Sequence, residues 1–362
     1  MKGKIAVMSK PGSLEYQEYE VPSPGPGSVV VKVLCSNVCG SELHIWSGHH
    51  PKKCGGLGHE TVGVVHELGE GVVTDNAGQA IKVGDRIAAT YFIACQRCAS
   101  CQSGKLNLCE NAYSFWAKQP EEAPHFHTTF ATHYYIHPGQ FFYKVPKNVP
   151  DKLAAGANCA LSQVYYGVDL SGVSINDSLV VQGAGGLGIY ATAIAKAKGA
   201  RVIVIDADSS RLELAREFGA DHVLNIQQYP TREERIQAVK ALTDGRGADV
   251  CVEVAGVPEA FVEGLELVRS GGRFVTMGNV TPGKTILIDP GFITRQQISI
   301  IPVMRYQPQY LHKALTFLSD NIEKLPFHKM LDAEYSLEGV ESALSDSMSR
   351  KVTRASIVMS EG

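Results

Sequence analysis

SLVVQGAGGLGIYATAIAKAKGA, residues 178–200, decides the fold of the second half of the chain. A short apolar run leads into a glycine-rich turn, and an apolar pattern with helical spacing follows it. The run RVIVID comes next, at residues 201–206. This order of strand, helix and strand predicts a parallel sheet covered by helices, the Rossmann type of doubly wound α/β fold.

The alternation of helix and strand extends well beyond this segment. It continues through SRLELAREFGA (210–220), ADVCVEVAG (248–256) and GGRFVTMGNV (271–280). We therefore expect a Rossmann domain over residues 161–301.

The first part of the chain has a different character. Runs rich in β-branched residues and separated by glycines predict short strands joined by tight turns, as in VVVKVLC (29–35), TVGVVHELG (61–69) and DRIAATYF (85–92). After about Ile301 there remain one amphipathic helix, LHKALTFLSDNI (311–322), and one strand, RASIVMS (354–360). This tail is too short for a third domain, so residues 1–160 and 302–362 are expected to form one mainly β domain.

The glycine-rich turn matches the pattern G-x-G-x-x-G in its proper context, between a strand and a helix. Gly183 can make the tight turn, Gly185 lets backbone amides approach a pyrophosphate, and Gly188 allows close packing of helix on strand. The free N–H groups at the start of the helix favour an anion. The expected cofactor-binding residues of this turn are Gly183, Gly185, Gly186, Leu187 and Gly188.

The end of the next strand indicates which dinucleotide binds. Asp206 lies about 20 residues after the turn, where an acidic side chain accepts hydrogen bonds from the adenosine ribose. A carboxylate there repels a 2′-phosphate, which favours NAD over NADP. Arg211 lies close to it in sequence and weakens that preference.

Bulk properties exclude several classes of function. The 362 residues carry 34 Lys and Arg against 37 Asp and Glu, a formal charge of −3 without a long basic or acidic block, so a nucleic-acid partner is not expected. No apolar run reaches the length of about 18 residues that a membrane span needs. The N-terminus, MKGKIAVMSK, predicts a first strand rather than a signal peptide, so we expect a cytoplasmic protein.

Four of the nine cysteines lie close together in the sequence. Two residues separate Cys95 from Cys98 and Cys98 from Cys101, and Cys109 follows. Thiolates at this spacing can surround one tetrahedral Zn²⁺, and four of them leave no position for a substrate, so the site would be structural. An iron–sulfur centre is the alternative, but its usual pattern has proline after the fourth cysteine, whereas Glu110 stands here.

Three further residues could make a zinc site with an open position: Cys39 in NVCGSELH, His59 in GLGHE, and Cys159 in NCALS. A set of two cysteines and one histidine, completed by water, is a catalytic arrangement in which zinc polarises an alcohol oxygen. Because these residues come from distant segments, spacing alone does not establish the set.

The order of all these motifs resembles the zinc-containing medium-chain alcohol dehydrogenase family over nearly the whole chain. The matching series runs from Cys39-Gly-Ser-Glu-Leu-His44 and Gly58-His59-Glu60 through the four cysteines to Cys159 and the turn at 183–188. The resemblance implies a GroES-like catalytic domain beside the Rossmann domain, two zinc ions per chain, NAD, and a homodimer or homotetramer. It also implies hydride transfer between a small alcohol and NAD, giving a ketone or aldehyde.

The resemblance assigns roles to residues around the catalytic zinc. Cys39, His59 and Cys159 would be its ligands, and Glu60 would approach the metal while ligands exchange. Glu42 would accept a hydrogen bond from the other ring N–H of His59 and so fix its tautomer. Ser41 and His44 would carry the alcohol proton outward by way of a ribose hydroxyl.

Other residues depart from the family pattern or match no role in it. Cys35, Cys54 and Cys251 are expected to be buried thiols. A long aromatic insert, SFWAKQPEEAPHFHTTF (114–130), holds His125 and His127, which we expect in a loop near the substrate mouth.

Aromatic residues give a first indication of the substrate. A pocket wall formed by them would favour a secondary alcohol of apolar or alicyclic character. The residues concerned are Trp46, Tyr91, Phe92 and Trp116. A polyol or amino-alcohol dehydrogenase is the nearest alternative. A zinc-free reductase and a non-catalytic relative are alternatives of another class, but both should lack one or more of the three catalytic ligands.

Overall fold

The computed structural model describes residues 1–278, 283–331 and 333–359. The chain divides into two compact units, residues 1–162 with 307–362, and residues 163–306. Within the described residues, no helix has the length and apolar character needed to cross a bilayer.

The first unit is built around antiparallel strands. Its main sheet has the order β15-β16-β3-β5-β6-β8, with β7 also paired to β3, and a smaller sheet has the order β2-β1-β4. In order along the chain, its strands are β1 (Lys2–Lys10), β2 (Ser13–Glu20), β3 (Val29–Asn37), β4 (Gly55–Gly56), β5 (Glu60–Leu68), β6 (Arg86–Ile93), β7 (His133–Ile136), β8 (Gln140–Lys144), β15 (Ala333–Tyr335) and β16 (Ala355–Val358). The strands expected from the three β-branched runs are present as β3, β5 and β6.

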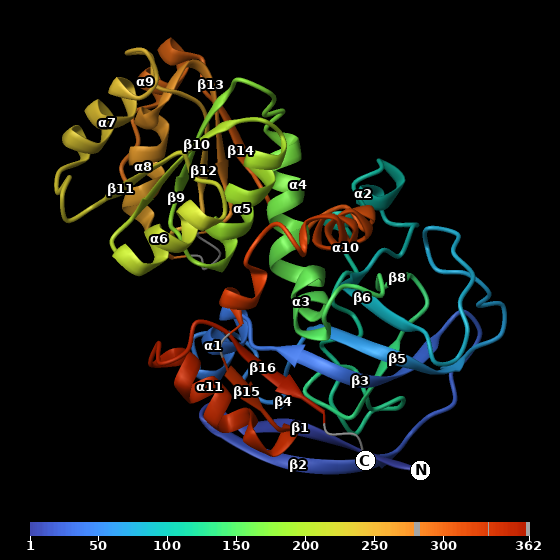
Figure 1. Cartoon of the computed structure of the whole chain (residues 1–362). Helices are drawn as coiled ribbons and strands as arrows, with labels where there is room; N and C mark the ends of the chain where they lie inside the picture. Colours follow the sequence, from blue (N-terminus) through green and yellow to red (C-terminus); the bar gives the residue numbers. More distant parts are fainter. Residues whose placement is uncertain (279–282, 332, 360–362) are drawn as a thin grey trace. The chain divides into compact units, whose positions relative to one another are not determined.

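Helices lie around these sheets, and most of them are short (Figure 1). The helices of the unit are α1 (Gly40–Trp46), α2 (Ala99–Gln102), α3 (Asp151–Gly156), a π-helical turn (Ala157–Leu161), α10 (Gln309–Asn321) and α11 (Val340–Met348), with single 3₁₀ turns at Leu106–Leu108, Phe327–Met330 and Leu337–Gly339.

The tail returns to this unit with more structure than we expected. The expected helix is α10, and the expected final strand is β16, which pairs with β3; Ser360 lies outside the described residues. The prediction missed α11, whose side chains Val340, Ala343 and Leu344 are completely buried. These apolar residues are spaced by three and four, but the polar residues between them make the pattern weak in the sequence.

The second unit has a parallel sheet of six strands in the order β11-β10-β9-β12-β13-β14. Along the chain its elements are α4 (Ser162–Leu170, which begins at the boundary), β9 (Ser178–Gln182), α5 (Gly186–Ala197), β10 (Arg201–Asp206), α6 (Ser209–Glu217), β11 (His222–Asn225), α7 (Arg232–Ala241), β12 (Ala248–Glu253), α8 (Pro258–Leu267), β13 (Val268–Thr276), α9 (Pro290–Gln296) and β14 (Ser299–Pro302). The predicted alternation of strand and helix is confirmed; Asn279 and Val280, at the end of one expected strand segment, lie outside the described residues.

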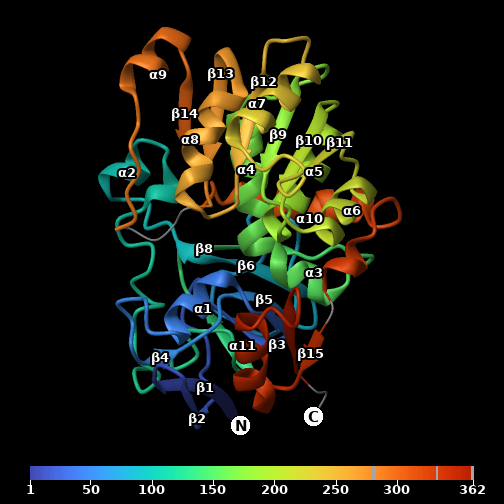
Figure 2. The ribbon, with the colours of Figure 1, turned by 90° about the vertical axis from the view of Figure 1, so that its left-hand side faces the viewer.

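Helices cover both faces of this sheet (Figures 1 and 2). Ile203 and Ile205 of β10 pack with Val239 of α7 and Leu265 of α8 in one apolar cluster, while α5 and α6 contact β10 from the other face. Strands buried on both faces explain the nearly continuous apolar runs in the sequence. The doubly wound α/β fold of the second unit is therefore confirmed, and the first unit is mainly β.

Candidate metal centres and nucleotide-binding turn

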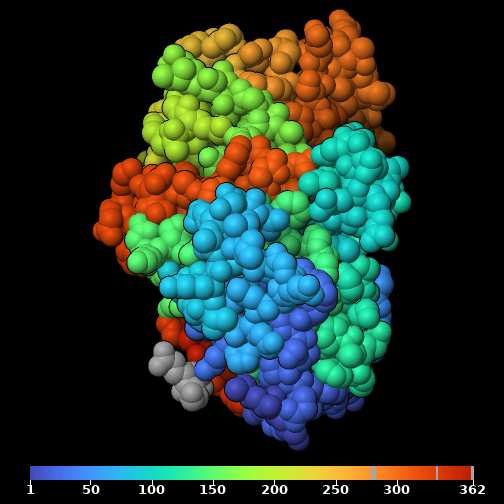
Figure 3. Space-filling model, turned by 90° about the vertical axis from the view of Figure 1, so that its right-hand side faces the viewer, coloured from blue at the N-terminus to red at the C-terminus, as the bar shows by residue number. Residues whose placement is uncertain are grey.

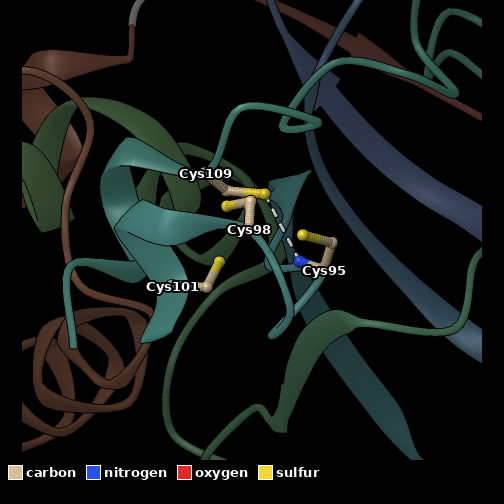
Figure 4. A group of neighbouring side chains, drawn as sticks. All are labelled: Cys95, Cys98, Cys101 and Cys109. Carbon is tan, nitrogen blue, oxygen red and sulfur yellow. Dashed lines mark hydrogen bonds between the residues drawn. The ribbon is translucent and has the colours of Figure 1, made fainter. Parts of the chain in front are cut away.

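The four clustered cysteines converge in the structure (Figure 4). The Sγ atoms of Cys95, Cys98, Cys101 and Cys109 all lie within 4.8 Å of one another. Tetrahedral zinc bound at about 2.3 Å places its sulfur ligands about 3.8 Å apart, so the group fits a closed zinc site. We call residues 95–109 the cysteine lobe; its turquoise atoms form part of the molecular surface in Figure 3.

Backbone and side-chain donors surround the sulfur atoms of the lobe. The N–H of Cys95 donates to Cys109 Sγ over 3.3 Å, and Asn111 Nδ2 donates to Cys95 Sγ over 3.4 Å. The backbone N–H of Arg97, with further donors, lowers the pKa of Cys95 to about 6, and the N–H of Glu110 lowers the pKa of Cys98. Donors that stabilise thiolates in this way also suit thiolates bound to a cation.

A second group of potential ligands lies deeper in the same unit. The ligand atoms of Cys39, His59, Glu60 and Cys159 are all within 4.8 Å of one another. Cys39 immediately precedes α1, His59 immediately precedes β5, Glu60 is the first residue of β5, and Cys159 belongs to the π-helical turn. We call these four residues the buried centre.

The spacing within the buried centre suits zinc. Cys39 Sγ lies 4.0 Å from Cys159 Sγ, and His59 Nε2 lies 3.3 Å from Cys159 Sγ. Tetrahedral zinc implies about 3.8 Å between two sulfurs and about 3.5 Å between sulfur and nitrogen. The close thiol of Cys159 lowers the pKa of Cys39, which gives the pair one sulfur suited to bind as thiolate.

Glu42 connects two of these residues from the first turn of α1. Its Oε1 lies 2.5 Å from His59 Nδ1, and its Oε2 accepts a 2.9 Å hydrogen bond from the N–H of Cys39. The ring nitrogen nearest Cys159 is therefore Nε2, and Nδ1 faces the carboxylate. Burial lowers the pKa of His59, but the charge of Glu42 and the Cys39 contact outweigh it and raise the pKa well above its usual value.

Glu60 has a buried partner that the sequence did not suggest. Arg354 Nη2 donates to Glu60 Oε2, and the Glu60 side chain is fully buried. Burial raises the pKa of Glu60 to about 7, although Arg354 opposes that rise. Glu60 Oε1 has no hydrogen-bond partner among the described residues, so one oxygen beside the ligand atoms remains available.

The π-helical turn is held in place by a second residue that the sequence did not suggest. Asn158 Nδ2 donates to the carbonyls of His59 and Ala89, each over 2.9 Å. These bonds tie the turn that carries Cys159 to β5 and β6. A π-helical turn inserts one extra residue and often marks a functional site.

Ser41 and His44 occupy the exposed face of α1, while Glu42 and Ile45 are buried. Residues three apart on a helix lie on the same face. The structure therefore brings Ser41 and His44 to one surface of the helix that begins beside Cys39.

The glycine-rich turn of the second unit has the geometry that its sequence predicts. Gly183 has a φ of +100°, and a Cβ there would lie 2.9 Å from Ala255 Cα. A Cβ on Gly188 would lie 1.8 Å from the Gly183 carbonyl oxygen. Only glycine fits at these two positions. Gly185 faces open space at the start of α5, since a Cβ there would have no atom within 4 Å, and free N–H groups can meet a phosphate at this point.

Asp206 stands at the end of β10 beside this turn. Its Oδ2 accepts from the Ala184 N–H over 2.6 Å, and its Oδ1 accepts from the Asp208 N–H over 2.8 Å. These bonds fix the carboxylate next to the glycine-rich turn. Arg211 lies in the first turn of α6, where its backbone N–H bonds to Asp208.

The aromatic residues expected in a pocket wall, and the cysteines outside the two ligand groups, differ in their burial. Tyr91 contacts the His59 ring at 5.0 Å, but Phe92 and Trp46 are only 2% and 6% exposed and pack in the apolar core. Cys35 and Cys251 are buried as expected, whereas Cys54 is exposed. The prediction for Cys54 was wrong because its loop, with His50, Pro51, Lys52 and Lys53, has little apolar character.

His125 and His127 lie in a loop, as expected, but His127 is buried within the insert. It is 3% exposed, its Nε2 donates to the Glu122 carbonyl over 2.9 Å, and its Nδ1 lies 3.3 Å from His137 Nε2. His125 stacks on Tyr19 with ring centres 4.4 Å apart. These histidines hold the insert together by packing and hydrogen bonds.

Comparison with known proteins agrees with this arrangement. Residues 25–147 match the alcohol dehydrogenase GroES-like domain, and residues 186–320 match the zinc-binding dehydrogenase family. The chain is 32% identical over 350 residues to 5-exo-hydroxycamphor dehydrogenase of Pseudomonas putida, covering 94% of each protein. It is 35% identical over 293 residues to L-threonine 3-dehydrogenase of Pyrococcus horikoshii, covering 78% of each.

A solved structure shows the same likeness along the whole chain. Alcohol dehydrogenase from Thermotoga maritima superposes with a TM-score of 0.93 at 30% identity, covering 99% of this chain and 100% of that one. Fold, ligand clusters and relatives together define a zinc-dependent oxidoreductase that acts on alcohols. The chain belongs to the zinc-containing medium-chain alcohol dehydrogenase family.

Proposed function

We propose that the protein is an NAD-dependent dehydrogenase that oxidises a secondary alcohol of apolar or alicyclic character to a ketone, with two zinc ions per chain. The observation that carries the proposal is the buried centre, where the ligand atoms of Cys39, His59, Glu60 and Cys159 lie within 4.8 Å of one another. Three protein ligands and an adjacent carboxylate suit an open catalytic site.

The residues in and next to the buried centre would have different roles in catalysis. Zinc, when bound by Cys39, His59 and Cys159, supplies the Lewis acidity that lowers the pKa of the alcohol. Glu42 orients the His59 ring through the 2.5 Å contact at Nδ1. Glu60, with one oxygen free of protein partners among the described residues, can approach the metal while other ligands exchange.

Proton transfer would use the exposed face of α1. The Ser41 hydroxyl would receive the alcohol proton, and His44, one turn further along, would pass it toward solvent. The cysteine lobe, in this proposal, stabilises the fold and takes no part in the reaction, because four thiolates leave no open coordination position.

Asp206 supports NAD as the dinucleotide. Its carboxylate is fixed beside Gly183 and Gly185 by two backbone N–H groups. A negative charge in that place accepts hydrogen bonds from ribose hydroxyls and repels a 2′-phosphate.

Two relatives support different substrate classes. The 5-exo-hydroxycamphor dehydrogenase of Pseudomonas putida supports an alicyclic secondary alcohol, and the edge of Tyr91 against His59 supplies an aromatic surface at the buried centre. The L-threonine 3-dehydrogenase of Pyrococcus horikoshii supports the second candidate, an amino alcohol.

A panel of alcohols tests the proposal. Cyclohexanol, 2-butanol, sorbitol and L-threonine would each be offered with NAD and with NADP, and reduction of the dinucleotide followed by absorbance. We expect the highest kcat/KM with the alicyclic alcohol and NAD. Failure to reduce either dinucleotide with any alcohol would overturn the proposal.

Asp206→Gly should lower the preference for NAD over NADP by about tenfold or more, which corresponds to a free-energy difference of about 1.4 kcal/mol or more.

We also propose that the protein is cytoplasmic and forms a homodimer or homotetramer. None of the nine cysteines forms a disulfide, which suits the reducing cytoplasm. A homodimer or homotetramer is supported by β14, which ends the sheet order of the second unit, and by exposed apolar side chains of this unit: Ile300 (37% exposed) in β14, Met304 (53%) just after it, and Leu287 (95%). Light scattering during gel filtration measures the assembly, and Ile300→Lys should weaken it.

A further inference from the structure

A series of aromatic contacts leads away from the buried centre within the first unit. The Tyr91 ring meets His59 edge-on at 5.0 Å, Tyr113 lies 6.4 Å from Tyr91, and Trp116 lies 6.2 Å from Tyr113 between ring centres. Tyr113 and Trp116 belong to the segment that follows the cysteine lobe, and Tyr91 belongs to β6. This series connects the candidate metal ligands to Trp116.

Trp116 carries a polar group, the indole N–H, for which the described residues provide no hydrogen-bond partner. Its ring packs against the apolar cluster that contains Ile45 and Trp46 of α1 and Leu57, two residues before His59. Its Nε1 is buried and finds no hydrogen-bond acceptor in the described part of the chain. A buried indole N–H ordinarily has an acceptor, so its lack here indicates that something else supplies one.

Lys52 places a positive charge on the same tryptophan. Its Nζ lies 3.8 Å from the centre of the Trp116 ring and 3.5 Å from the Trp116 carbonyl oxygen. No carboxylate of the described residues lies within ion-pair distance of this ammonium group. Burial lowers the pKa of Lys52 to about 8, against the opposing influence of Glu42 and Cys54.

The chain segment around Lys52 is basic and contains no acidic residue that could neutralise the lysine, so an anion could bind there. The segment from His44 to Lys53 contains three histidines and two lysines and no acidic residue. The two acids that flank this segment along the chain already have partners: Glu42 is engaged by His59 and the Cys39 N–H, and Glu60 by Arg354. Lys53, by contrast, is exposed, and its Nζ donates to the Gly48 carbonyl over 2.7 Å. Lys52 is therefore the lysine of this segment that faces a tryptophan and lacks a strong acceptor.

We propose that Lys52 Nζ and Trp116 Nε1 form a specificity subsite that binds a carboxylate carried by the alcohol substrate. The inference rests on the proposed function and deepens it, because it adds an acidic substituent to an otherwise apolar or alicyclic secondary alcohol. The ammonium group supplies a charge-assisted hydrogen bond to one carboxylate oxygen, and the indole N–H supplies a neutral one. The aromatic rings from Tyr91 to Trp116 would accommodate the carbon skeleton between hydroxyl and carboxylate.

Matched alcohols test the subsite in the zinc-loaded enzyme. Cyclohexanol, 4-hydroxycyclohexanecarboxylate and the corresponding neutral carboxamide would be compared by kcat and KM with NAD, for wild type, Lys52→Met, Trp116→Phe and Lys53→Met. We expect wild type to prefer the carboxylate over cyclohexanol in kcat/KM by about 10- to 100-fold, the range for a hydrogen bond to a charged group.

The variants should separate the subsite from a structural role. Lys52→Met should remove most of that preference through KM, so that kcat/KM falls for the carboxylate about tenfold more than for cyclohexanol. Trp116→Phe should reduce the preference less, and Lys53→Met should leave it intact.

Several results would overturn the subsite. These are a wild type that does not prefer the carboxylate, equal use of the carboxamide, and an equal loss of both substrates in Lys52→Met. Cyclohexanol turnover without a carboxylate preference would refute the subsite and leave the proposed function standing. If none of the alcohols reduced NAD, the proposed function would fail with it.

Discussion

The cysteine lobe and the buried centre both bring cysteine sulfurs together, but the lobe offers only sulfur, whereas the buried centre adds an imidazole nitrogen and a carboxylate oxygen. The lobe gathers Cys95, Cys98, Cys101 and Cys109 from one short stretch, near the surface and with backbone N–H donors around its sulfurs. The buried centre gathers its four residues from three distant segments, and neither its own carboxylate, Glu60, nor the adjacent carboxylate of Glu42 is exposed. A local spacing suffices for the first site, whereas the second requires the folded unit.

The difference has a physical cause. A closed thiolate site needs only a loop that brings sulfurs to one point, and its function is to hold that loop. An open site must orient its ligands and leave a position unfilled, so it needs partners such as Glu42 on His59 and Arg354 on Glu60. Buried charges are costly unless paired, which explains why each acid in this centre has a defined partner.

The largest expected effect is the loss of catalysis from the buried centre. His59→Ala removes one ligand and the partner of Glu42, so kcat/KM should fall by at least about 10³-fold. Steady-state kinetics with the best alcohol measures the loss, and thermal unfolding checks that the protein remains folded. Activity within tenfold of wild type would refute the role of this centre.

Loss of a lobe ligand should act on stability instead. Cys98→Ser should destabilise the first unit by about 2–3 kcal/mol, equivalent to a fall in Tm of about 5–10 °C. Turnover per folded molecule should change little at a temperature well below Tm. Cys54→Ser is the matched control, because Cys54 is exposed and outside both clusters. A lobe variant that unfolds at the wild-type Tm but turns over no substrate would reverse the roles assigned to the two sites.

A smaller effect should follow from altering the residue that orients His59. Glu42→Gln keeps an acceptor for Nδ1–H but removes the charge, and should lower zinc affinity of the buried centre or kcat/KM by about 10- to 100-fold. Glu67→Gln, an exposed acid of the same β5 strand that His59 precedes, is the control. Equal behaviour of the two variants would show that the 2.5 Å contact has no functional weight.

The smallest expected effect is a gradual loss of stability in acid. Burial lowers the pKa of His133 to about 4 and the pKa of His137 to about 3, below the ordinary value of 6.5. Below about pH 6.5 the unfolded chain therefore binds more protons than the folded chain, and Tm should decline as the pH falls toward 4. His133→Gln should make that decline shallower, and an unchanged slope in this variant would exclude His133 as a source.

Much of the fold and the lobe could be predicted from the sequence, because their causes are local. The turn at Gly183–Gly188 follows a strand and opens a helix, and the lobe cysteines are neighbours in the chain. Asn158 and Arg354 could not be predicted in this way. Arg354 is 294 residues from Glu60, and nothing near either residue indicates that they meet. Burial of His127 and exposure of Cys54 likewise depend on tertiary packing.

The most direct test of the two-site account is the zinc content of purified protein, measured by mass spectrometry of the metal for wild type, Cys98→Ser and His59→Ala. We expect about two zinc ions per chain in wild type and about one in each variant, with dehydrogenase activity retained only in wild type and Cys98→Ser. A wild type with one zinc, or a Cys98→Ser variant that loses both zinc ions while remaining folded, would contradict it.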